Sequence, residues 1–153
     1  RHAEAQMTPD VNVLVAAMRL DHPHHAIAYN HLQSELKKAS LRPNNTSVVL
    51  LGVVVAGFIR VVTNRKIFQL PSSLNQAIEF IDTLLLSPGV AFQSAGSQWP
   101  GFKDLCLNAE ISPDSATDMW IAASALQSGE ILHTFDRDFK KILPAENLYL
   151  VSR

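Results

Sequence analysis

Helical and extended patterns alternate in short units at the end of the chain, and this alternation constrains the fold most. A helix is predicted over about Pro113–Ser128, and Gly129 is a typical residue to end it. A strand over Ile131–Phe135, a short helical turn and a strand over Asn147–Val151 follow. Strands that alternate with helices of this length favour a parallel sheet with helices on both faces. We therefore predict a three-layer α/β/α fold.

The earlier part of the chain continues the same alternation. Strands are predicted at about Ala5–Pro9, Thr46–Leu50 and Gly89–Gln93, and helices over His24–Ala39, Ser72–Leu86 and Trp99–Asn108, with a further helix from the second strand through Val62. The central parallel sheet should thus have four to five strands. We expect one domain over residues 7–153, because this length suits a single core. Residues 1–6 differ from the rest and are predicted to be an added remnant or a disordered leader.

Composition excludes several classes of protein. The single cysteine, Cys106, has no partner for a disulfide, which favours a reducing cytoplasm. The longest apolar run, Val48–Ile59, is shorter than the roughly 18 to 20 residues that span a bilayer, so we expect buried core and no membrane segment. No charged-then-apolar leader opens the chain. The net charge of -1 lacks the basic excess of many nucleic-acid binders, although local charge decides where a polyanion binds.

Three aspartates are predicted to meet at one edge of the sheet. Asp10 follows the first strand, Asp136 ends the strand near residue 135, and Asp118 lies in the first turns of the preceding helix. Ligand sites of such sheets lie beyond the carboxyl ends of the strands, where the following helices also begin. Asp138 lies two residues beyond Asp136 and is a further candidate.

Carboxylates packed a few Å apart repel, so a cation is needed to hold them together in the ionised form. Mg²⁺ or Mn²⁺ suits such oxygen ligands and keeps waters that a phosphate displaces. The implied reaction is metal-assisted hydrolysis of a phosphodiester. Each acid also has an ordinary structural role open to it: Asp10 in a turn, Asp118 in a capping box with Ser115, and Asp136 at a strand-to-helix corner.

Four segments, in the same order, resemble the signature segments of VapC-type PIN domains, the toxin ribonucleases of toxin-antitoxin pairs, and in particular their mycobacterial branch. The segments are Thr8–Val15, Gly57–Asn64 with Ile67 and Phe68, Thr117–Ala123, and His133–Phe139. The resemblance implies a Mg²⁺- or Mn²⁺-dependent endoribonuclease of a type II toxin-antitoxin system. It also implies an RNA substrate, a VapB-type antitoxin that blocks the site, and a homodimer formed through helices.

Carried over by position, the resemblance implies catalytic, metal-binding roles for Asp10, Asp118 and Asp136, and a metal-binding role for Asp138. Asn12 and Thr134 would be their polar supports. Many PIN nucleases have a glutamate near the position of Gly52 or Gly57, whereas this chain has no acid from Ser40 to Gln76. The candidates for binding RNA phosphates are Arg60, Arg137 and Lys140, with Arg65, Lys66 and Lys141 as further basic residues nearby.

Two further features are interpreted as structural. His22, His24 and His25 crowd together after Asp21, but a proline separates the first from the others, so we expect a solvated helix start rather than a metal site. Trp99 and Trp120 are expected to be packing residues, with Trp120 close enough to Asp118 to line a groove.

Two alternatives to the nuclease stay open at this stage. The missing middle acid favours a PIN-fold module that binds protein or RNA without catalysis. A Mg²⁺-dependent phosphoryl-transfer or receiver-like α/β protein is less favoured, because the sequence has no P-loop and no lysine in the late-strand position of a receiver.

Overall fold

The computed structural model describes residues 6–93, 96–108 and 115–152, and in these residues five strands form one parallel sheet. The strands are β1 (Met7–Pro9), β2 (Val48–Leu50), β3 (Val90–Phe92), β4 (Ile131–Thr134) and β5 (Leu148–Leu150). Their order across the sheet is β3-β2-β1-β4-β5. The predicted fold class is confirmed. The order differs from the 2-1-3-4-5 order of receiver domains, which argues against the receiver-like alternative.

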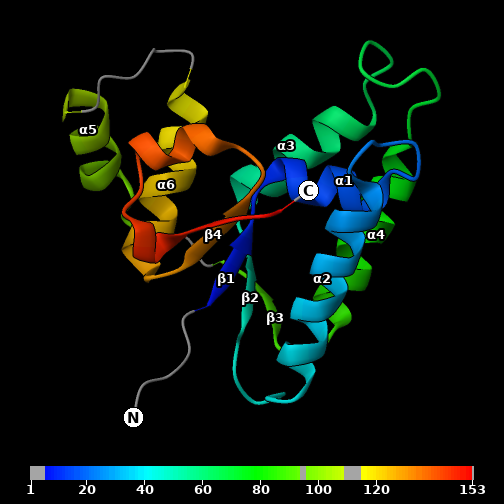
Figure 1. Ribbon diagram of the computed structural model, residues 1–153, viewed down its shortest axis with the longest axis horizontal. Helices are drawn as coiled ribbons and strands as arrows, with labels where there is room; N and C mark the ends of the chain where they lie inside the picture. The colour runs from blue at the N-terminus through cyan, green and yellow to red at the C-terminus, as the bar shows by residue number, and fades with distance from the viewer. Residues whose placement is uncertain (1–5, 94–95, 109–114, 153) are drawn as a thin grey trace.

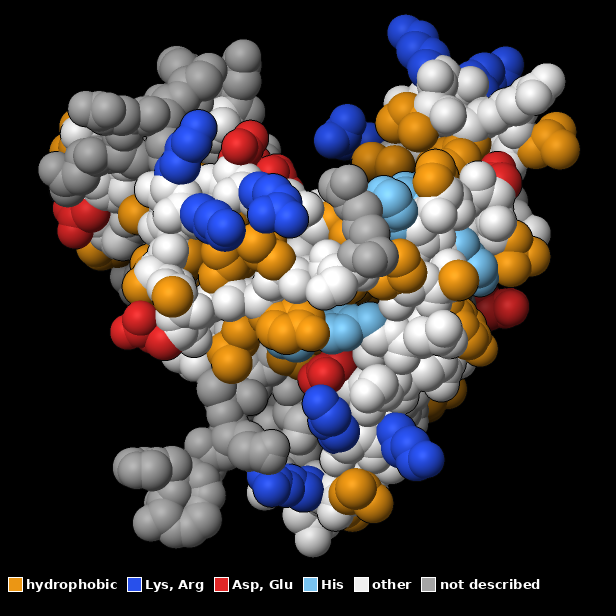
Figure 2. Space-filling model, viewed as in Figure 1, with side chains coloured by type: hydrophobic (Ala, Val, Ile, Leu, Met, Phe, Trp, Pro, Cys, Tyr) orange, Lys and Arg blue, Asp and Glu red, His pale blue; other side chains and the backbone are white. Residues whose placement is uncertain are grey.

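Helices cover both faces of the sheet, as Figure 1 shows. The helices are α1 (Val11–Met18), α2 (His25–Ser40), α3 (Gly52–Val62), α4 (Leu74–Leu86), α5 (Trp99–Asn108) and α6 (Ala116–Ser128), with the short 3-10 helices η2 (Arg137–Lys141) and η3 (Ala145–Asn147). Helices α1, α2 and α4 lie on one side, and α5 packs on α6 on the other. Helix α3 contacts α1, α4 and α6. Beyond the strands the two helical layers diverge and leave a hollow (Figure 2).

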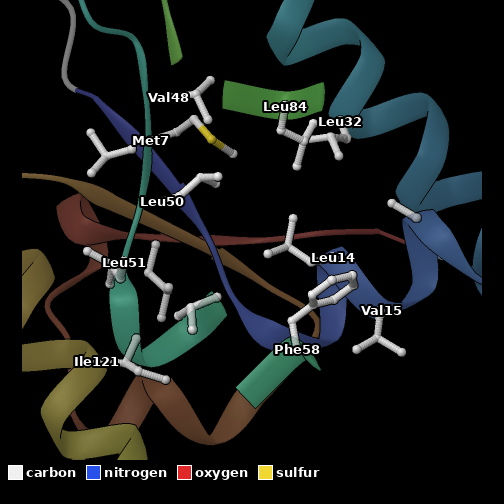
Figure 3. Close-up of a cluster of buried hydrophobic side chains, with 14 of the residues drawn as sticks. Met7, Leu14, Val15, Leu32, Val48, Leu50, Leu51, Phe58, Leu84 and Ile121 are labelled. Carbon is white, nitrogen blue, oxygen red and sulfur yellow. The ribbon is translucent and has the colours of Figure 1, made fainter. Parts of the chain in front are cut away.

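The apolar run at Val48–Ile59 supplies much of the core, as predicted, although Gly52 and Ala56 within it are exposed. The side chains of Val48, Val54 and Phe58 are at most 1% exposed. Figure 3 shows strand side chains, with Met7 and Leu50 among them, packed against helix side chains that include Leu14, Leu32, Phe58 and Leu84. A parallel strand buried on both faces needs such continuous apolar sequence, which is why periodicity could not separate β2 from α3. No described helix is long and apolar enough to cross a membrane.

The helix ends follow the expected capping chemistry, with one displaced start. Gly129 takes a left-handed conformation (φ 66°), and its N–H bonds to the last turn of α6. The start of α4 was predicted at Ser72, but the capping residue is Ser73, whose side chain and backbone exchange hydrogen bonds with Gln76. The hydroxyl of Ser72 instead accepts a hydrogen bond from Arg19.

Strand β4 ends one residue earlier than predicted. The N–H of Phe135 donates to the side chain of Asn12 at 3.2 Å rather than to a neighbouring strand. Of the predicted leader, residues 1–5 lie outside the described residues, and the backbone carbonyl of Gln6 accepts a hydrogen bond from Ile131. The predicted helix start at Pro113 also lies outside the described residues.

Candidate active site

The three predicted aspartates line one cavity at the carboxyl edge of the sheet. Asp10 follows β1 and caps α1, Asp136 follows β4 and caps η2, and Asp118 lies in the first turn of α6. Their cavity has a volume of about 650 Å³. Its position has a topological cause, because the chain runs from β1 to β2 and β3 on one side and then crosses to β4 and β5 on the other. Asp10 and Asp136 therefore lie at the switch point of the sheet, where ligands bind in folds of this class.

Asp10 is held rigidly although its side chain is ionisable and buried. It is 5% exposed, and its Oδ1 accepts a 2.8 Å hydrogen bond from the N–H of Val11. Its Oδ2 accepts a 2.7 Å hydrogen bond from the hydroxyl of Thr134. The N–H of Asp10 donates to the carbonyl of His133, which ties β1 to β4 at this point. The carboxylate thus has a single orientation toward the cavity.

Thr134 and Asn12 make hydrogen bonds around the acids. The Thr134 hydroxyl donates to Asp10 and accepts from the N–H of Asp136 at 3.0 Å and from the side-chain amide of Asn12 at 3.2 Å. These three bonds use the one donor and both acceptor positions of a hydroxyl. One buried side chain therefore fixes Asp10 relative to the backbone of Asp136.

Electrostatic repulsion among the acids is visible in their pKa values. The pKa of Asp10 is raised from 3.8 to about 6, chiefly by burial; hydrogen bonds from Thr134 and Val11 oppose this rise, and the charges of Asp118 and Asp136 add to it. The pKa of Asp118 is also raised, first by burial and then by Asp136 and Asp138. The carboxylates are therefore close enough to interact.

The donor set fits a hard divalent cation. Neither of the two ion pairs between described residues involves these acids, so no described side chain neutralises them directly. The carboxylate oxygens of these acids do not all lie within 4.8 Å of one another. Among the described residues, only His31, Glu35 and His133 form a group with ligand atoms that close together. Mg²⁺ retains several waters in its coordination shell, so an ion can be held by one or two of these acids directly and by the others through water.

The remaining predicted residues divide into two groups. Arg60 lines the cavity with the acids. Asp138, Arg137 and Lys140 lie on η2 and do not line it. The N–H of Asp138 donates a hydrogen bond to the carboxylate of Asp136. Asp136 therefore also serves as the turn residue between β4 and η2. The capping box between Ser115 and Asp118 does not form, because the Ser115 side chain makes no capping hydrogen bond.

Helix α3 contributes no acid to the cavity. Val53 and Gly57 of α3 line the cavity, whereas Gly52 lies beside Phe92 in a neighbouring groove. A side chain at Gly57 would be crowded, because its Cβ would lie 3.0 Å from a methyl carbon of Val11. The wall is therefore apolar, and Arg60 is the charged side chain that α3 contributes to the cavity.

Sequence reasoning missed the role of His22, which lines the cavity. His24 instead stacks on Phe135 with ring centroids 5.3 Å apart, and a ring nitrogen of His25 lies 2.9 Å from the carbonyl of Ala16. The rings of His22 and His24 also lie 5.7 Å apart, whereas His25 packs beside Tyr29. His22 has no helical register with the acids, so only tertiary structure reveals its place.

The two tryptophans differ in exposure, since Trp99 is 58% exposed and Trp120 is half-buried. Phe102 lies between them, with its ring centroid 5.9 Å from Trp99 and 5.1 Å from Trp120. Trp120 lines a groove next to the acid cavity rather than the cavity itself.

Comparison with known proteins gives the same family from sequence and from structure. The PIN domain family matches residues 7–143. VapC ribonuclease Mb2897 of Mycobacterium bovis is 35% identical over 133 residues, which cover 86% of each chain. VapBC2 of Rickettsia felis, solved bound to a promoter DNA fragment, has a similar fold with a TM-score of 0.61 at 21% identity, covering 94% of this chain and 96% of that one.

A second solved structure agrees on the fold. VapC20 of Mycobacterium tuberculosis, described as a Sarcin-Ricin loop cleaving toxin, has a TM-score of 0.61 at 14% identity and covers 88% of this chain and 93% of that one. The family match over residues 7–143 and the likeness to two solved folds thus agree with each other. The chain belongs to the PIN-domain family and, within it, to the VapC ribonucleases.

Proposed function

We propose that this protein is the toxin of a type II toxin-antitoxin pair and hydrolyses RNA phosphodiester bonds with the aid of Mg²⁺ or Mn²⁺. One observation carries the proposal: carboxylates from β1, β4 and α6 line the same cavity without an ion-pair partner among the described residues. Such an arrangement is costly in an isolated protein, because the buried charges repel. It becomes favourable when a divalent cation binds.

Each residue of the site has a role that follows from its position. Asp10, Asp118 and Asp136 hold the cation, and Thr134 and Asn12 orient Asp10. A bound divalent ion would neutralise the scissile phosphate and lower the pKa of an attacking water. Arg60, which lines the same cavity, would bind a phosphate of the RNA backbone. Arg137 and Lys140 on η2 extend the basic surface on the side of the acids; Figure 2 shows Lys and Arg side chains on both sides of the hollow.

A VapB-type antitoxin is the expected partner. The fold resemblance to VapBC2 and the relatives named VapC support this proposal. An antitoxin that covers the cavity with a cationic side chain would satisfy the same carboxylates and exclude the metal. We also propose that the toxin is a cytoplasmic homodimer, and sedimentation of the purified protein tests the dimer directly.

The alternative is a PIN-fold module that binds a partner but does not cleave RNA. The apolar wall at Val53 and Gly57 favours it, because fewer carboxylates bind a cation more weakly. Calorimetric titration with Mn²⁺ separates the two functions. The nuclease requires Mn²⁺ binding that is lost when Asp136 is replaced by Asn, whereas a module of this kind has no need of the ion.

The replacement Asp118→Asn tests the catalytic proposal. It keeps the shape of the side chain but removes its charge from a half-buried site. We expect cleavage of purified RNA substrates in Mn²⁺ to fall by more than about 100-fold, since even supporting residues of metal sites contribute 10- to 100-fold. Growth inhibition on induced expression should disappear in parallel.

Asp82→Asn is the matched control, because Asp82 is exposed on α4 and does not line the cavity. It should retain full activity. A fully active variant that carries both Asp10→Asn and Asp118→Asn would exclude the proposed site.

A further inference from the structure

Two histidines and a glutamate cluster between α2 and β4, and none of the three lines the acid cavity. His31 and Glu35 lie one turn apart on α2, and His133 is the third residue of β4. One potential ligand atom from each lies within 4.8 Å of the other two. The sequence distance between His31 and His133 is 102 residues, so only the packing of α2 against the sheet brings them together.

The cluster is preorganised by contacts on several sides. Nε2 of His31 and Nδ1 of His133 face each other at 2.8 Å. The ring of Tyr149 stacks on both imidazoles, with centroids 5.3 Å from His31 and 4.7 Å from His133. His133 is 6% exposed, whereas His31 and Glu35 are half-buried and open to solvent on one side. Figure 2 shows histidine side chains reaching the surface between hydrophobic and acidic groups on this face.

The two imidazoles are in the state that binds metals. Burial lowers the pKa of His31, and it lowers the pKa of His133 to about 3, so both rings are neutral at pH 7. In a neutral pair, one proton lies between the facing nitrogens. When each ring carries its proton on the outer nitrogen instead, both facing nitrogens point lone pairs at the same space.

The donor set selects a particular class of ion. Two imidazole nitrogens and one carboxylate form the three-ligand set of open Zn²⁺ sites, and Mg²⁺ prefers oxygen ligands. Ligands of a tetrahedral Zn²⁺ lie about 3.3 Å apart, given bonds of about 2.05 Å. The facing nitrogens would separate by roughly half an ångström to admit the ion. The ammonium group of Lys38 contacts Oε2 of Glu35 at 3.2 Å, but the Lys38 side chain is 67% exposed. The other carboxylate oxygen of Glu35, Oε1, can then bind the ion.

We propose that His31, Glu35 and His133 bind a transition-metal ion of the Zn²⁺ type at a second site, distinct from the aspartates. The ion joins α2 to β4. Its effect reaches the acid cavity through the backbone, because the carbonyl of His133 accepts the hydrogen bond from the N–H of Asp10 and the next residue, Thr134, binds the Asp10 carboxylate. The second site thus stabilises the strand that positions Asp10.

Calorimetric titration of the untagged protein with Zn²⁺ tests the proposal, with saturating Mg²⁺ present to occupy the aspartates. His31→Gln and Glu35→Gln are the informative variants, because both side chains are partly solvent-exposed and their loss leaves the core intact. Each should weaken Zn²⁺ binding by more than about 10-fold. The controls His25→Gln and Glu146→Gln replace the same residue types outside the cluster and should bind Zn²⁺ like the wild type.

X-ray absorption at the zinc edge identifies the ligands. We expect two imidazole nitrogens at about 2.0 to 2.1 Å in the wild type and one in His31→Gln. Circular dichroism verifies that each variant is folded. The proposal is overturned if the wild type binds no Zn²⁺, if both cluster variants bind it unchanged, or if Asp118→Asn abolishes binding while His31→Gln does not.

Discussion

The hydroxyl of Thr134 donates a 2.7 Å hydrogen bond to Oδ2 of Asp10, and 124 residues of chain separate the two. Both side chains are buried, and the bond crosses from β4 to the end of β1 at the switch point of the sheet. The same hydroxyl accepts a hydrogen bond from the N–H of Asp136. The geometry of two proposed metal ligands therefore depends on one threonine.

Thr134→Val tests this dependence, since valine keeps the shape of threonine and removes the hydroxyl. We expect Mn²⁺ affinity and RNA cleavage to fall by about 10- to 100-fold, because the ligand Asp10 loses its orientation. The free energy of unfolding should fall by about 1 to 3 kcal/mol, since buried polar groups lose their partner. Calorimetry and urea denaturation measure the two effects. Thr134→Ser restores the hydroxyl and should recover most of the Mn²⁺ affinity; equal loss in both variants would contradict a role for the hydrogen bond.

The raised pKa of Asp10 predicts how the stability of the metal-free protein depends on pH. The folded state holds the proton more tightly than the unfolded state, because the pKa of Asp10 is about 6 in the fold and 3.8 for an unperturbed aspartate. The stabilisation is complete below pH 3.8 and is lost as the pH rises through 6, with a magnitude on the order of 3 kcal/mol at most. Asp10→Asn should remove this part of the pH dependence in thermal unfolding.

Mn²⁺ should reverse the trend. The cation competes with the proton for Asp10, so saturating Mn²⁺ should raise the melting temperature more at about pH 7 than at about pH 5. Thermal unfolding at both pH values, with and without Mn²⁺, measures this difference. An equal rise at both would show that Asp10 is not a ligand.

Arg60 lines the same cavity as the acids, which predicts a contact with the RNA backbone. In Arg60→Gln, the affinity for single-stranded RNA should fall by a similar factor for all sequences, because a phosphate contact carries no sequence information. The slope of log affinity against log salt should decrease by roughly 0.7. Fluorescence anisotropy with the inactive Asp118→Asn background measures both. The control is Lys37→Gln, because Lys37 is exposed on α2 and does not line the cavity. It should leave the salt slope unchanged.

Phe58 is fully buried in α3 and stacks against Phe80 with ring centroids 5.3 Å apart. Phe58→Ala should reduce the free energy of unfolding by about 3 to 5 kcal/mol, because it leaves a cavity in the core beneath the site. Urea denaturation measures the change. Leu70→Ala removes a side chain that is 80% exposed and should change stability by less than about 0.5 kcal/mol.

Much of the fold could be predicted from local patterns. Apolar segments bounded by turn residues predicted every described strand to within about two residues, and the glycine at 129 marked the end of α6 as it does in many helices. The start of α4 was displaced by one residue because Ser72 and Ser73 are equally good caps in sequence. The hydroxyl of Ser72 is bonded to Arg19, which lies 53 positions away, so Ser73 caps the helix.

The candidate site could be predicted only in part. Asp10, Asp118 and Asp136 were found because strand ends and helix starts of a parallel sheet share an edge, and the signature segments agreed with that rule. His22, Val53 and the cluster of His31, Glu35 and His133 were missed. These residues meet through the packing of helices on the sheet, which no spacing in the sequence records.

The sequence by itself determined which segments are strands and helices and which edge of the sheet carries the acids, because both follow from local periodicity and chain direction. Only the tertiary structure decided the strand order, the burial that raises the pKa of Asp10, and the meeting of α2 with β4. These depend on contacts between residues that are remote in the chain. Desolvation and these hydrogen bonds require atoms to be close in space, so they arise only when the helices have packed on the sheet.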